Sequence, residues 1–340
     1  MVNHQYIERH TQQVRDEALH GDAVVRALYS AAPERAQWLT AIASSQWVSD
    51  SLAFISYDRL LGSRVTGMKG FLQRAALDLA ECVEPPANLD TAQKIFERQI
   101  RFWECRPLPD DSTTAVCPAD SRVLVGSLAD SSLLFIKEKF FNCAELLSAD
   151  RSRWLNAFAG GDFAVFRLTP EKYHYVHVPA AGLVQDFYEV RGRYHSCNPG
   201  ALVSLVAPHA KNRRVITIMQ TDVAGGTGIG LVAIIEVVAL MVGQIVERYS
   251  EEKYDAPRRL EPGMFLRRGQ PKSLFRPGSS TVILLFQPER VRFADDLIRN
   301  RFRRDATSRF SLGFDQSIVE TDVAVRSLLA FRQPNERNSV

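Results

Sequence analysis

The chain has 340 residues, of which 46% are hydrophobic and 24% charged, and its net charge at pH 7 is +3. This composition is that of a globular protein of one or two domains, and the small net charge argues against nucleic acid as a partner. Five scattered cysteines without a CxxC pair argue against a disulfide framework and indicate a reducing compartment. The polar start MVNHQYIERH carries no secretory signal.

We expect residues 1–106 to form a helical region. Apolar residues recur at three- and four-residue spacing over 35–62 and again over 69–83, where Pro85 and Pro86 then stop the pattern. The amphipathic stretch 38–54 is a candidate for contact with a membrane surface, although ordinary core packing explains the same pattern.

A short helix is predicted within residues 91–104, and the sequence RPLPDDS marks a boundary near 106–113. Beyond it, short β-branched and aromatic runs such as RVLVGS, FAVFRL, YHYVHV, RVITIM and STVILLF alternate with turns. A helical pattern interrupts them only in CAELLSADRSRWLNAF, which Gly160 and Gly161 end.

These elements predict the α+β class. The connections between strands are mostly too short for repeated helical crossovers, so the sheet should be mostly antiparallel. We expect a β-rich, sandwich-like or barrel-like catalytic domain at 107–292, and a C-terminal extension at 293–340 that packs on it.

The apolar segment from Gly228 to Val246 is long enough to span a bilayer and contains one charge, Glu236. Its Val and Ile content and the cost of a carboxylate in lipid favour two consecutive buried strands, or a strand and a core helix. Gly228, Gly230 and Ala233 also satisfy a loose GxGxxA pattern. A turn between strands is favoured over a dinucleotide-binding loop, because no clean ribose-binding acid ends a following strand.

Two histidines, His174 and His177, lie three residues apart in EKYHYVHVPAAG. The β-branched and aromatic residues around them predict a strand, which sends the two side chains to opposite faces. Joint metal binding is therefore not expected, and no third ligand has a zinc-like spacing. From spacing alone, two structural histidines are the favoured interpretation, and one histidine facing a site is the alternative. Asp120, after Pro118, suits a turn and could also orient a histidine.

The sequence LFRPGSSTVILLF contains Gly278 and Ser279 at the entrance of a predicted strand. Alone, these residues make an ordinary turn. A serine hydroxyl can also attack the carbonyl carbon before it, and the ester that forms can eliminate to cut the chain. Such a cut would leave a pyruvoyl group at the new amino terminus, and a glycine before the serine leaves room for the attack.

The segment RRGQPKSLFRPGSSTVILLF resembles the cleavage-site region of the phosphatidylserine decarboxylase family. YHYVHVPAAG is similar to that family's YHxxHxPxxG signature, PADS to its PADG element, and VVALMVGQI to its VGAxxVGxI segment. AQKIFERQI followed by CRPLP resembles the lead-in to PADG. The motifs occur in the family's order and cover residues 92–286, which makes the set more specific than any one motif.

The resemblance implies self-cleavage between Gly278 and Ser279, into a β chain of residues 1–278 and an α chain of residues 279–340. The pyruvoyl group made from Ser279 would be the covalent cofactor and would take up electrons as CO₂ leaves. The resemblance also implies an Asp120–His177–Ser279 arrangement, in which His177 takes the serine proton and Asp120 orients the imidazole. His174 is implied to contact the substrate carboxylate or the intermediate, and no metal is expected.

Three departures from the family pattern leave alternatives open. Ser121 replaces the glycine of PADG, and Val238 replaces the first glycine of VGA. GSSTV is one residue longer than GSTV, so Ser280 is an alternative nucleophile. Ser279 is favoured because it directly follows the glycine.

The leading functional expectation is a pyruvoyl-dependent decarboxylase that converts phosphatidylserine to phosphatidylethanolamine. It would be cytoplasmic and peripheral on a membrane, with the phospholipid and its own cleaved chains as partners; a homodimer is compatible with the sequence. The alternative is a soluble amino-acid decarboxylase, as in the fungal tryptophan decarboxylases of the same superfamily. A degenerate member that binds lipid without cutting itself is the third alternative.

Overall fold

The computed structural model of this chain describes residues 3–17, 77–129, 142–193, 199, 208–238, 244–277, 280–311 and 317–333. The helices expected over 35–62 and most of 69–83, together with the amphipathic stretch 38–54, lie outside these ranges. The residues of the expected cleavage site, Gly278 and Ser279, also lie outside them.

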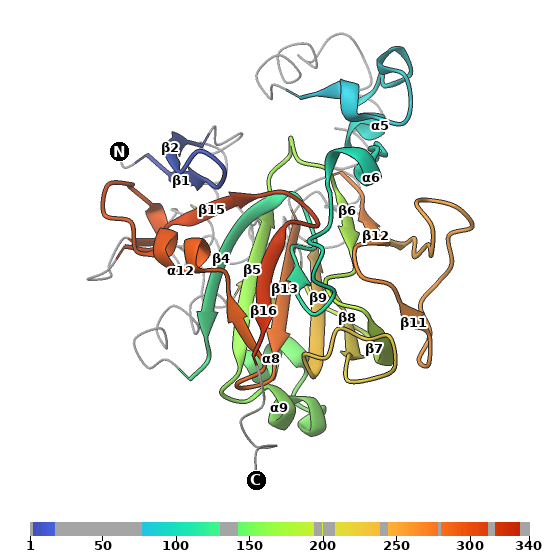
Figure 1. The fold of residues 1–340 in the computed structure, drawn as a ribbon, viewed down its shortest axis with the longest axis vertical. Helices are drawn as coiled ribbons and strands as arrows, with labels where there is room; N and C mark the ends of the chain where they lie inside the picture. Colours follow the sequence, from blue (N-terminus) through green and yellow to red (C-terminus); the bar gives the residue numbers. More distant parts are fainter. Residues whose placement is uncertain are drawn as a thin grey trace, which may run out of the picture.

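Among the described residues, ten strands form one open sheet in the order β11-β7-β8-β9-β13-β5-β4-β15-β1-β2, whose central strands stand upright in Figure 1. Neighbours in the sheet run antiparallel, as predicted, with one parallel pair, β1 and β15. The strands are β1 (Gln5–Glu8), β2 (Gln13–Asp16), β4 (Ser121–Ser127), β5 (Asp162–Leu168), β7 (Gly182–Val190), β8 (Arg214–Gln220), β9 (Leu231–Val238), β11 (Phe265–Leu266), β13 (Ser280–Phe286) and β15 (Glu320–Val323).

The sheet has two edges, β11 and β2, so the described strands do not close into the barrel that was one of the expected forms. Two small three-stranded sheets contain the other strands of the described residues. One has the order β10 (Ile245–Glu247), β12 (Pro271–Phe275) and β6 (Tyr175–His177); the other has the order β14 (Val291–Phe293), β16 (Leu328–Arg332) and β3 (Ala115–Val116).

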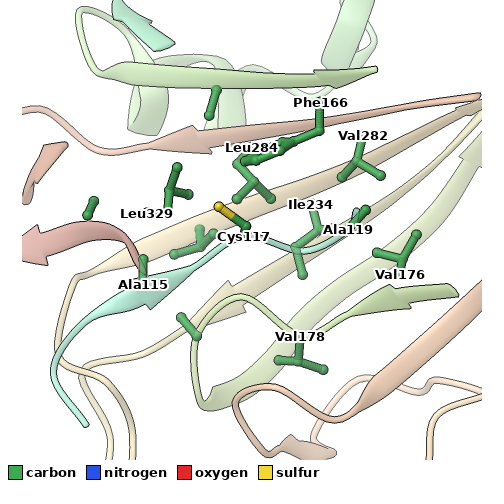
Figure 2. Packing of buried hydrophobic residues seen from close by; sticks show 14 of the residues in the cluster. Ala115, Cys117, Ala119, Phe166, Val176, Val178, Ile234, Val282, Leu284 and Leu329 are labelled. Atoms are coloured by element: carbon green, nitrogen blue, oxygen red, sulfur yellow. The ribbon is translucent and has the colours of Figure 1, made fainter. Parts of the chain in front are cut away.

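The larger core lies between one face of the ten-stranded sheet and the two small sheets. Figure 2 shows Val176 of β6 and Val178, just after β6, close to Ile234 of β9 and Val282 of β13, all of them buried. Burying an aliphatic side chain of this size stabilises a fold by roughly 1.5–3 kcal/mol. This packing therefore fixes β6, which ends at His177, against the centre of the main sheet.

The opposite face of the sheet is covered by two short helices, α8 (Cys143–Leu147) and α9 (Ser152–Phe158), at the lower end of Figure 1. Trp154 and Phe158 of α9 belong to the same buried cluster as Ile235 and Ile283. Because both faces of the central strands are buried, β9 and β13 are almost continuously apolar rather than alternating. The segment suspected of spanning a membrane is β9 followed by β10, and no helix among the described residues is long and apolar enough to span one.

The expectation of a helical region over residues 1–106 is wrong where the structure describes strands. β1 and β2 lie in this region and pair with each other, and Ile7 of β1 is fully buried. The other partner of β1 is β15, about 310 residues away in the chain, so no local pattern could signal this pairing. The helix expected over 91–104 is two helices, α5 (Ala92–Phe96) and α6 (Phe102–Cys105), because Ile100 between them bridges to Cys82.

The remaining described helices are short. They are η2 (Leu79–Glu81), η3 (Pro86–Asn88), α11 (Pro208–Lys211), α12 (Asp295–Arg301) and η5 (Arg309–Ser311). The glycine run at 225–230 is a turn between β8 and β9, as predicted, with Gly228 and Gly230 at φ 76° and 75°.

Candidate active site

His177 ends β6, and both nitrogens of its buried ring have partners. Nδ1 lies 2.8 Å from the carbonyl oxygen of Gly269, and Nε2 lies 2.9 Å from the hydroxyl of Tyr173. Since a carbonyl oxygen only accepts, Nδ1 carries the proton of the neutral ring, and Nε2 is the basic nitrogen. Burial lowers the pKa of His177 to about 3, so the ring is neutral at pH 7.

Gly269 is suited to its place opposite His177 for a steric reason. Its φ is +75°, a left-handed conformation that side chains disfavour. A Cβ at this position would also lie 2.7 Å from Cδ2 of Leu108. The close approach of this backbone is what brings a carbonyl oxygen to Nδ1 of His177.

Asp120 lies just before β4, and its carboxylate is held by partners other than His177. Arg106 donates to both carboxylate oxygens at 3.3 and 3.1 Å, and the N–H of Val325 donates at 2.7 Å. Burial raises the pKa of the Asp120 carboxyl, but the Arg106 guanidinium outweighs it and holds the pKa below the usual value. Arg106 also binds Glu81. The carboxylate is therefore ionised at neutral pH.

Asp120 and His177 are brought into one neighbourhood, because the N–H of His177 donates to the carbonyl of Pro118 at 2.7 Å. Their side chains do not hydrogen-bond to each other; Gly269 and Tyr173 orient the imidazole instead. The expected relay from Asp120 through His177 stays a prediction. Sequence reasoning did not identify Arg106 or Tyr173 as partners, although both lie inside the quoted motifs CRPLP and YHYVHV.

His174, on the segment leading into β6, has different surroundings from His177, as the strand prediction requires. Its ring contacts the Phe96 ring at a centroid distance of 4.8 Å, and Nε2 lies 3.4 Å from the carbonyl oxygen of Pro170. Nδ1 is buried and has no hydrogen-bond partner among the described residues. Burial, with the nearby Arg98 charge, lowers the pKa of His174 to about 4.

Ser280 is the first residue of β13, directly after the two residues of the expected cleavage site. It pairs in register with Leu168 of β5 and Val238 of β9. Its hydroxyl is fully buried and has no partner among the described residues. On the other side of the expected site, the N–H of Phe275, the last residue of β12, donates to the carbonyl of His174 at 3.1 Å.

A buried ion pair joins β12 to β9 beside this point. Lys272 Nζ and the Ser273 hydroxyl both bind the carboxylate of Glu236, and all three residues are fully buried. Where β9 pairs with β13, Glu236 lies opposite Val282 and Val238 lies opposite Ser280. Residues two apart on a strand point to the same face, so the side chains of Glu236 and Ser280 lie on the same face of the sheet. Such diagonal neighbours are roughly 7–8 Å apart.

One group of possible metal ligands occurs in the described part of the chain, formed by His4, Glu17 and Glu320. Arg167 donates to both carboxylates, at 2.8 Å to Glu17 and 3.0 Å to Glu320. Two carboxylates already neutralised by a buried guanidinium are poor ligands for a cation, so we assign this group to a structural ion network that joins β1, β5 and β15.

The buried histidines predict a stability that falls with acidification. Burial lowers the pKa of His174 to about 4, of His177 to about 3 and of His209 on α11 to about 4. The unfolded chain protonates these rings near pH 6.5 and the folded chain does not, so each subtracts about 1.4 kcal/mol per pH unit from the free energy of unfolding below that pH.

Urea unfolding at pH 7.5, 6.0 and 5.0 measures this dependence. Over this interval three histidines protonate mainly in the unfolded chain and dominate the slope, while Asp162, whose pKa burial raises to about 6, offsets part of it. We expect the midpoint to fall steadily from pH 6.5 to pH 5.0, and His174→Gln to reduce the slope. A midpoint independent of pH over this interval would contradict neutral burial of these rings.

Most residues of the described site lie in a part of the chain that matches one known protein family. The phosphatidylserine decarboxylase family model matches residues 92–307. The phosphatidylserine decarboxylase proenzyme of Bordetella petrii is 32% identical over 238 residues, covering 66% of this chain and 79% of the relative. That of Bordetella pertussis is 34% identical over 232 residues, covering 66% and 76%. That of Chlamydia trachomatis serovar D is 30% identical over 300 residues, covering 86% and 90%.

Proposed function

Because the chain belongs to the phosphatidylserine decarboxylase family, we propose that it is a carboxy-lyase that converts phosphatidylserine to phosphatidylethanolamine and CO₂. The proposal rests on one observation: residues from separate family motifs lie close together in the fold. β12, which pairs with β6, ends at Phe275, and β13 begins at Ser280 with a buried, unpartnered hydroxyl among the described residues. His174 contacts the end of β12 through its backbone.

The proposed maturation is a cut between Gly278 and Ser279 by the chain itself. The Ser279 oxygen would add to the carbonyl carbon of Gly278 and replace the amide bond by an ester. Elimination of that ester would free the carboxylate of Gly278 and leave dehydroalanine at residue 279, from which water would release ammonia to give the pyruvoyl group. His177 is the proposed base, since its Nε2 is unprotonated in the neutral ring. Asp120, ionised and fixed by Arg106, supplies negative charge near the imidazole. Ser280 remains the alternative nucleophile.

A pyruvoyl group at residue 279 fits the residues around the start of β13. The Ser280 hydroxyl and Nδ1 of His174 are buried polar atoms without partners in the described part of the chain, and buried polar groups of this kind call for one. The group supplies a carbonyl that takes the substrate amine and accepts electrons as CO₂ is lost. Strand β13, which pairs with a strand on each side, would hold the group, and we propose His174 as the residue that contacts the substrate.

Mass spectrometry of the purified protein tests the maturation. We expect two chains, residues 1–278 and residues 279–340, the second blocked by a pyruvoyl group. A chain of residues 280–340 would make Ser280 the nucleophile. An intact 340-residue chain after incubation under mild conditions would refute the proposed maturation.

Release of CO₂ from different substrates tests the reaction itself. Phosphatidylserine in mixed micelles should be decarboxylated, and free tryptophan and free serine should not. The relatives described above are all named phosphatidylserine decarboxylase proenzymes, so the soluble amino-acid decarboxylase is not favoured. Activity on free amino acids alone would reverse this order. Peripheral binding to membranes is part of the proposal, because the substrate is a lipid.

A further inference from the structure

Arg98, two residues beyond α5, is a buried cation that lacks an anionic partner among the described residues. Its side chain is 8% exposed; Nη1 donates to the carbonyl of Ile95 at 2.7 Å and Nη2 to that of Glu171 at 3.0 Å. In the described part of the chain no carboxylate forms an ion pair with it. Asp120 and Glu81, whose charges reach Arg98, are both bound by Arg106. A buried charge without a partner is costly, and a guanidinium held by neutral carbonyls keeps donors available for an anion.

His174 lies beside Arg98 and lacks a hydrogen-bond donor among the described residues, just as Arg98 lacks an anion there. The two side chains reach successive carbonyls of one loop, Arg98 that of Glu171 and His174 that of Pro170. Since the Pro170 oxygen only accepts, it places the proton of the neutral ring on Nε2 and leaves Nδ1 as an acceptor without a donor. Together the pair offers donors for an oxyanion and an acceptor for an N–H group.

The loop that carries these carbonyls begins where β13 begins. β5 ends at Leu168, which pairs in register with Ser280, and Pro170 is two residues further along. From the other side, His174 accepts from the N–H of Phe275 at the end of β12. His174 therefore contacts the end of β12, and the loop that Arg98 contacts begins beside the start of β13.

We propose that Arg98 forms a subsite for an oxyanion of the substrate head group, with Nδ1 of His174 as an acceptor toward the head-group nitrogen. The inference rests on the proposed function and names a specificity residue for it. A guanidinium binds carboxylate and phosphate oxygens through two parallel hydrogen bonds, so both anions of a phosphoserine head group match its chemistry. This contact would orient the bound substrate so that its reacting carbon lies at the first residue of the α chain.

Three variants of the mature enzyme test the subsite. Arg98→Met removes the charge, Arg98→Lys keeps the charge without the planar fork, and Arg153→Met, an exposed arginine on α9, is the matched control. With a short-chain phosphatidylserine, we expect KM to rise about tenfold or more in Arg98→Met and less in Arg98→Lys, with kcat changed little. Arg153→Met should match the wild type.

A binding measurement identifies which oxyanion Arg98 holds. Glycerophosphoethanolamine has the phosphodiester and no carboxylate, and its affinity for the mature enzyme is measured by titration calorimetry. Weaker binding to Arg98→Met assigns the subsite to the phosphodiester. Unchanged binding together with a raised KM for phosphatidylserine assigns it to the carboxylate.

The outcomes separate this inference from the function on which it rests. A wild-type chain that neither cuts itself nor releases CO₂ from phosphatidylserine refutes the proposed function. A mature, active wild type with unchanged KM and unchanged binding in the Arg98 variants refutes the subsite alone. If Arg98→Met does not fold, as shown by the loss of a cooperative urea unfolding transition, Arg98→Lys decides: a wild-type KM in that variant overturns the proposal.

Discussion

Replacing His177 by alanine is expected to leave the chain uncut. The substitution removes the nitrogen that we propose takes the serine proton, and a positioned base of this kind is typically worth about 10²- to 10⁴-fold in rate. The geometry identifies the atom, since Nδ1 is committed to the Gly269 carbonyl and only Nε2 can accept a proton. The formation of separate α and β chains over time, followed by gel electrophoresis and mass spectrometry, measures the effect.

Two further variants separate chemistry from packing. His209→Ala also removes a fully buried imidazole, from α11, and should still mature because that ring takes no part in the proposed reaction. Tyr173→Phe removes the hydroxyl that contacts Nε2 and should change the rate of cutting less than His177→Ala does. Cutting of His177→Ala at the wild-type rate would remove this residue from the role of base.

Replacing Lys272 by methionine is expected to destabilise the protein by about 3–5 kcal/mol, because it leaves the Glu236 carboxylate buried without its counter-ion. Both side chains are fully buried, so water cannot replace the lost partner. Replacing both residues by methionine should cost much less, since two apolar side chains of similar volume leave no charge behind. Chemical unfolding in a Ser279→Ala background, where the proposed cut cannot occur, measures the difference.

The control for this experiment is an ion pair at the surface. Lys94 pairs with Asp90 one helical turn away, and both are exposed, so Lys94→Met should change stability little. An equally small effect of Lys272→Met on stability would show that the Lys272–Glu236 ion pair does not stabilise the fold.

We also expect slower self-cleavage in Lys272→Met. The ion pair joins β12, which precedes the cleavage segment, to β9, which pairs with the strand after that segment.

Much of the fold could be predicted because strands and turns depend on neighbouring residues. The run STVILLF forms β13, the segment with Glu236 forms β9 and β10, and the glycine run forms a turn. The expected helical patch at 143–158 is present but divided, with Ser148 at φ 77° between α8 and α9. The pairing of β1 with β15 could not be predicted, because its hydrogen bonds join segments at opposite ends of the chain.

The sequence by itself determined the family, the strands that carry its motifs, and the residue types available for proton transfer, because each of these depends on local order and spacing. Only the tertiary structure decided which groups meet. It gave His177 a carbonyl 92 residues away and Asp120 a backbone N–H 205 residues away, and within the described ranges it left Arg98 buried without an anion. These contacts form only when distant strands and loops pack together, so residue spacing alone does not predict them. Burial makes the energy of each contact large.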